Sequence, residues 1–104
     1  MTPRSSIDLK KFKASLDGDA PPAGLGKALQ ALWYQAKGDW ERAHRLAQAQ
    51  DDKNSAWVHG YLHRIKGKKA RASQWYRSAG RSLSSAPPKK EWEEIVAAIL
   101  RDKA

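Results

Sequence analysis

The chain has 104 residues, no cysteine, and 20 lysines and arginines against 11 acidic residues, which gives a net charge of +9. The lack of cysteine excludes disulfide bonds and thiolate metal sites. No apolar run approaches the ~18–20 residues that cross a bilayer, and the first residues are charged where a secretory signal needs an apolar core. We therefore expect a cytoplasmic protein without membrane contact, built as one domain over residues 1–104.

A short helix is predicted first in the chain. Leu9, Phe12 and Leu16 recur at helical spacing, and Ser6 precedes them as a candidate N-terminal cap. Gly18 is a residue type that commonly ends a helix.

Two helical hairpins are predicted next, at about residues 22–50 and 54–83. Gly38 and Gly67 stand between the two helices of each hairpin, where glycine allows the left-handed conformation that ends a helix. The first hairpin is expected to begin at its prolines, and the apolar stripe of the second runs to Leu83.

A last amphipathic helix is predicted at about residues 88–102, after a linker rich in serine and proline. No segment alternates apolar and polar residues, so no strands are expected. The predicted fold class is all-α, with about six helices: two stacked antiparallel hairpins flanked by N- and C-terminal helices.

The two hairpins are related by an internal repeat. A shift of 29 residues moves Gly38 onto Gly67, Arg42 onto Arg71 and Ala43 onto Ala72, and the apolar positions of the helices move in step. Each hairpin alone leaves an apolar face open, and stacking the two buries it.

The first inter-helix turn resembles that of the tetratricopeptide family. In residues 34–43 a glycine and an acid precede an aromatic residue and then a small alanine. The second copy keeps Gly67 and Ala72 but has Lys69 where the aromatic residue belongs, and the family repeat of about 34 residues is shortened to 29. Residues 61–64 and 74–77 are also similar to a group of small uncharacterised bacterial proteins.

The resemblance implies that the outer helices act as caps and that the first helix of each hairpin lines a concave, peptide-binding groove. The last helix could instead dock on a partner. The predicted groove face suits a carboxylate or another acidic ligand, although an ordinary solvated face is the alternative. Its residues are Gln30, Tyr34 and Lys37 in one copy and His59, His63 and Lys66 in the other.

A metal site and a catalytic site are both predicted to be absent, and no cofactor is expected. His59 and His63 have the i, i+4 spacing of a metal pair, but no glutamate stands between them and the only further histidine, His44, lies on another helix. The sequence also contains no nucleophile elbow, phosphate loop or dinucleotide fingerprint.

The basic residues gather in the second hairpin. Residues 53–90 contain no acid, and the densest group is Arg64, Lys66, Lys68, Lys69 and Arg71. Such a cluster is the electrostatic pattern of phosphate binding. The nearby aromatic residues Tyr61 and Trp75 lie in apolar stripes, which favours a place in the core over stacking on bases.

The resulting hypothesis is a non-enzymatic protein-interaction module, a monomer or weak homodimer, that binds an acidic or carboxylate-bearing partner segment. The alternative is weakly sequence-specific nucleic-acid binding through the basic second hairpin.

Overall fold

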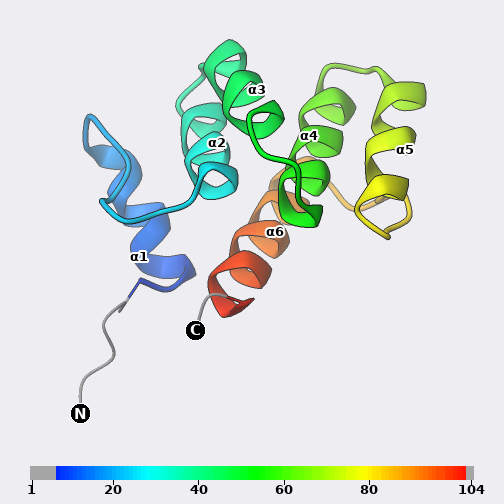
Figure 1. The fold of residues 1–104 in the computed structure, drawn as a ribbon. Helices are drawn as coiled ribbons and strands as arrows, with labels where there is room; N and C mark the ends of the chain where they lie inside the picture. The colour runs from blue at the N-terminus through cyan, green and yellow to red at the C-terminus, as the bar shows by residue number, and fades with distance from the viewer. Residues whose placement is uncertain (1–6, 103–104) are drawn as a thin grey trace.

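A computed structural model describes residues 7–102 of the protein, and every regular element in that range is helical. Six α-helices and one 3₁₀ turn follow one another along the chain (Figure 1), which confirms the predicted all-α class with six helices. They are α1 (Leu9–Ala14), η1 (Ser15–Asp17), α2 (Lys27–Ala36), α3 (Trp40–Gln48), α4 (Lys53–Ile65), α5 (Lys69–Ser78) and α6 (Pro88–Asp102).

Some helix ends differ from the predicted ones. The side chain of Asp8 caps α1 by accepting a hydrogen bond from the Lys11 amide at 2.9 Å, and the predicted cap, Ser6, lies outside the described residues. Helix α2 begins at Lys27 instead of near residue 22, because Gly24 adopts a φ of +85° that a right-handed helix does not contain. The prolines therefore belong to the loop before α2.

Helix α5 is shorter than its apolar stripe suggested. It ends at Ser78, and Gly80 then takes a φ of +75°. Leu83 lies beyond this turn and is 38% exposed, so the prediction that it belongs to the helix and its apolar face was wrong. The helix ends before Leu83 because a glycine stop overrides a periodic pattern.

The turns after α2 and α4 have the same structure at positions that are 29 residues apart. In the first, the amides of Gly38 and Asp39 donate to the carbonyls of Gln35 and Tyr34. The second has the same pair of bonds 29 positions later, and φ is +93° at Gly38 and +80° at Gly67. Both turns are Schellman caps, in which glycine meets the positive φ without strain.

The helices form two stacked hairpins with α6 laid across them. Helix α2 packs on α3 and α4 on α5, and α4 also packs on both helices of the first hairpin. Helix α6 contacts α1, α2 and α4 (Figure 1), and the Trp92 indole of α6 donates to the Leu32 carbonyl of α2 at 3.0 Å. The apolar face of α6 is thus buried on the chain's own core, where Ile95 and Val96 are fully covered.

Gly60 sets how closely α4 and α5 approach each other. A Cβ atom at this position would lie 2.5 Å from Cδ1 of Tyr76 and 3.2 Å from the Ala72 carbonyl oxygen. The Tyr76 ring is fully buried, so it has no room to move aside. Ala31, the residue 29 positions earlier, is also buried but carries its methyl group.

We predict that Gly60→Ala destabilises the protein, although glycine to alanine inside a helix usually stabilises by up to about 1 kcal/mol. Overpacking against Tyr76 costs about 1–3 kcal/mol and should outweigh that gain. Urea denaturation followed by circular dichroism measures the change, with Gln74→Ala on the exposed face of α5 as control. An increased free energy of unfolding for Gly60→Ala would show that the Tyr76 ring does not limit how closely α4 and α5 approach.

Candidate functional site

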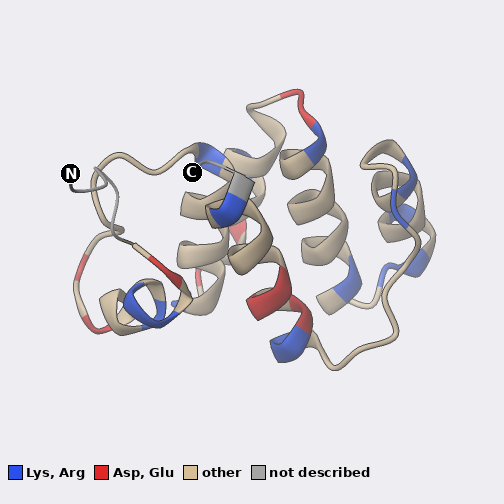
Figure 2. Ribbon diagram, turned by 90° about the horizontal axis from the view of Figure 1, so that it is seen from below, with Lys and Arg blue, Asp and Glu red and all other residues tan. Residues whose placement is uncertain are grey.

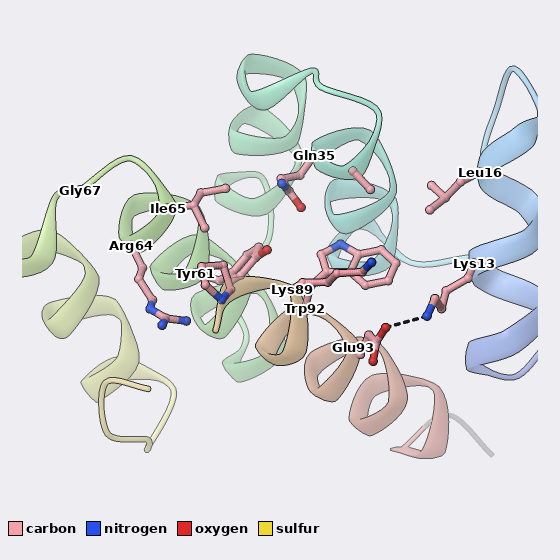
Figure 3. Close-up of a pocket in the computed structure, with 12 residues that line it drawn as sticks. Lys13, Leu16, Gln35, Tyr61, Arg64, Ile65, Gly67, Lys89, Trp92 and Glu93 are labelled. Atoms are coloured by element: carbon pink, nitrogen blue, oxygen red, sulfur yellow. Dashed lines mark hydrogen bonds and ion pairs between the residues drawn. The ribbon is translucent and has the colours of Figure 1, made fainter. Parts of the chain in front are cut away.

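A cavity of about 720 Å³ that opens to solvent lies between α1, η1, α2, α4 and α6 (Figure 3). Its size lies in the ~300–1,000 Å³ range of small-ligand sites. It is lined by Lys13, Leu16, Gln35, Ala36, Tyr61, Arg64, Ile65, Gly67, Pro88, Lys89, Trp92 and Glu93.

The two hairpins contribute equivalent residues to the cavity wall. Gln35 and Ala36 at the end of α2 correspond, by the 29-residue shift, to Arg64 and Ile65 at the end of α4. Helix α6 closes the opposite side with Trp92, which is 6% exposed. The wall is therefore mainly apolar and arises because α6 crosses the ends of α2 and α4 without filling the space between them.

A buried ion pair holds α6 to the second hairpin at the edge of the cavity. Arg64 donates to Glu91 Oε1 at 2.5 Å and to the Ala86 carbonyl. The other Glu91 oxygen accepts hydrogen bonds from the Tyr76 hydroxyl and, at 3.4 Å, from the Trp57 indole. Glu91 is only 1% exposed, so these three donors replace the water that a carboxylate otherwise needs.

The same network perturbs two tyrosines. Burial, together with the Glu91 charge, raises the pKa of Tyr61 to about 12. The pKa of Tyr76 also rises, because of its burial and then of the hydrogen bond that it donates to Glu91. Both hydroxyls thus stay protonated at neutral pH, and Tyr61 presents a neutral group to the cavity.

The rim of the cavity carries an excess of positive charge. Lys13 pairs with Glu93 at 2.6 Å across the mouth (Figure 3), and the hydrogen bond from Lys13 lowers the pKa of the Glu93 carboxyl. Lys89 is exposed and forms no ion pair within the described part of the chain. A carboxylate entering the cavity would find Lys89 available, with Lys13 able to exchange partners.

The residues predicted to form one groove face are separated by the structure. The Gln30 amide donates to the Leu25 carbonyl, Lys37 donates to the carbonyls of Leu16 and Gly18, and Arg42 stacks over the Tyr34 ring at 4.7 Å. None of these side chains lines the cavity. The groove helices are instead covered by α6, which the resemblance did not imply.

His59 and His63 were expected on an open face, and this was wrong. They are 4% and 5% exposed, because this side of α4 packs against α3 and α5. There they meet His44 of α3: the Nε2 atoms of His44 and His59 lie 2.9 Å apart. Lys66 remains exposed, with its ammonium group 4.8 Å from the Trp40 ring centroid.

The predicted phosphate-binding cluster is largely accessible but loses one member. Lys66, Lys68, Lys69 and Arg71 are exposed around the turn from α4 to α5, and Figure 2 shows blue but no red positions on α5. Arg64 was expected in this cluster, but its side chain is 15% exposed and committed to Glu91. Tyr61 is buried in the core, as predicted, and Trp75 stacks on His59.

No family model, curated protein or solved structure matches the chain. Its function is therefore inferred from the residues described above. Among the described helices, none combines the length and apolarity that a membrane span requires.

We predict that Glu91→Gln lowers the free energy of unfolding strongly, because removing one partner of a buried ion pair costs about 3–5 kcal/mol. Urea denaturation is the measurement. Glu93→Gln, which alters the partly exposed pair with Lys13, is the matched control and should change stability far less.

The double variant Arg64→Met, Glu91→Gln should recover part of the loss, since it leaves no uncompensated cation. Equal effects of Glu91→Gln and Glu93→Gln would contradict the assignment of Glu91 as the residue that holds α6 in place.

Proposed function

We propose that the protein is a non-enzymatic interaction module that binds an acidic, apolar segment of a partner in the cavity beside α6. The observation that carries the proposal is the combination of an apolar interior with a positively charged rim. Tyr61, Ile65 and Trp92 offer contacts to an apolar side chain, while Lys89 and Lys13 offer donors to a neighbouring carboxylate.

The overall charge supports an acidic partner. The net charge is +9, and the second hairpin, which forms one side of the cavity, contains no acid. The positive electrostatic potential around such a protein raises the association rate of an acidic segment and repels a basic segment.

We also propose that the hairpins are divergent, short members of the tetratricopeptide type. The repeated Schellman turns and the stacking of the hairpins support this. On this proposal the usual groove of the first helices is occupied by α6 of the same chain, and the cavity is the part of the groove that α6 leaves open. The partner would then insert one or a few side chains and not lie along the whole groove.

Binding is tested with a synthetic peptide of alternating glutamate and leucine, titrated into the full chain by isothermal calorimetry. A matched peptide with glutamine in place of glutamate reports the contribution of charge. We predict that Lys89→Glu weakens binding of the acidic peptide about tenfold or more, because a charge-assisted hydrogen bond is worth about 1.5–3 kcal/mol.

Arg77→Glu is the control for long-range attraction, since it makes the same charge reversal on an exposed residue of α5 that does not line the cavity. Equal losses of affinity in Lys89→Glu and Arg77→Glu would show that the peptide is attracted by the overall positive charge and does not bind in the cavity. Absence of binding by the acidic peptide at low salt would overturn the proposal.

Nucleic-acid binding is the second candidate, supported by the exposed cluster of Lys66, Lys68, Lys69 and Arg71. It ranks lower because Tyr76 is buried in the core and Arg64 is committed to Glu91, which leaves few groups beside the cluster to read bases. Binding to a random DNA duplex that falls steeply with salt and is weakened by Lys69→Glu, but not by Lys89→Glu, would favour this candidate.

A further inference from the structure

The three histidines of the chain form a single cluster between α3, α4 and α5. His44 comes from α3, and His59 and His63 lie one turn apart on α4. Their ring centroids are 4.6–5.3 Å apart, and one potential ligand atom of each lies within 4.8 Å of the others. The chain contains no other histidine and no cysteine, so all of its imidazole donors are gathered at this one place.

The cluster contains polar atoms that the protein does not satisfy. His59 and His63 are more than nine-tenths buried, and the Nδ1 atom of each has no hydrogen-bond partner among the described residues. The close approach of the Nε2 atoms of His44 and His59 is the only hydrogen bond within the cluster. Buried polar groups without partners cost about 1–3 kcal/mol each, and a folded protein seldom contains two side by side without a reason.

Aromatic side chains fix the imidazole rings from both sides. Trp75 of α5 stacks on His59 with ring centroids 3.9 Å apart, and Trp40 of α3 stacks on His44 at 4.9 Å. The rings therefore have few alternative rotamers, and two of the required donors come from an i, i+4 pair on a rigid helix.

A second cavity, of about 360 Å³, borders the cluster at His59. It is lined by His59 and Trp75 and by Asp51, Asp52 and Lys53 around the start of α4. Two acids against one lysine favour the approach of a cation from this side.

We propose that His44, His59 and His63 form a binding site for a first-row transition metal ion of the Zn²⁺ type, with the fourth position taken by water or an anion. Three nitrogen donors without a carboxylate favour Zn²⁺, Cu²⁺, Ni²⁺ or Co²⁺ over Mg²⁺ and Ca²⁺. The donor atoms now span up to 4.8 Å, whereas a tetrahedral zinc site needs nitrogen separations of about 3.3 Å. Small rotations of the rings therefore accompany binding.

The surrounding charges determine what fills the fourth position. Lys68 and Arg71 act on His63 with positive charge, and Glu41 acts on His44 with negative charge. Lys68 and Arg71 repel a bare metal cation. They therefore favour an anion, such as hydroxide or a carboxylate, as the remaining ligand of the bound metal. This site faces α3 and α5, so it is separate from the cavity beside α6.

The test uses the full chain without an affinity tag, first stripped with a chelator and then titrated with ZnCl₂ by calorimetry. We predict one ion bound per chain with a dissociation constant in the micromolar range or tighter. Substituting Co²⁺ should give the visible absorption of a four-coordinate site, and MgCl₂ should give no saturable binding.

His44→Gln is the critical variant, because His44 is only half-buried and its replacement should leave the fold intact. It should weaken Zn²⁺ binding at least tenfold and abolish the rise in Tm that the metal gives the native chain. Arg45→Gln, an exposed neighbour on α3, is the control and should bind as the native chain does.

Should His59→Gln or His63→Gln fail to fold, ring-nitrogen NMR of the native chain provides the second measurement, since Zn²⁺ must shift the signals of all three imidazoles. No saturable binding by the folded native chain, unchanged affinity in His44→Gln, or a shift of fewer than three imidazoles would overturn the proposal.

Discussion

The carboxylate of Glu91 fixes the position of α6, and the shape of the molecule depends on that position. One oxygen binds the Arg64 guanidinium and the other accepts hydrogen bonds from Tyr76 and Trp57. Three donors from α4 and α5 thus converge on a single residue in the first turn of α6. A buried charge of this kind adds little stability by itself. The hydrogen bonds that its carboxylate requires, however, are made in only one placement of α6.

This placement of α6 forms an open cavity against the two hairpins and separates two environments on α4. The residues of α4 that face α6, such as Tyr61 and Ile65, line or border the cavity, while His59 and His63 face α3 and α5. One helix therefore presents an apolar and positively charged wall on one side and a set of neutral imidazoles on the other. The two proposed sites can be altered independently, because they share no residue.

The order of helices and the two glycine turns could be predicted from the sequence, since periodic apolar residues and caps are local signals. The cavity and the histidine cluster could not, because both depend on how helices distant in the chain pack. In the sequence, Glu91 stands with Glu93 and Glu94 near the start of its helix, where acids commonly stabilise the helix dipole. Only the structure shows that Glu91 is buried and paired with Arg64. The i, i+4 spacing of His59 and His63 was visible, but the approach of His44 required the stacking of α3 on α4.

The contact between Trp92 and Leu32 joins residues 60 positions apart in the chain, which has a consequence for biosynthesis. Both hairpins are synthesised before α6, so the apolar surfaces of α2 and α4 that α6 covers have no cover until α6 has been made. A nascent chain in this state resembles the substrates that chaperones recognise. The same surface would be exposed again whenever α6 detaches, so proteolytic cleavage within residues 79–87 should report on that opening.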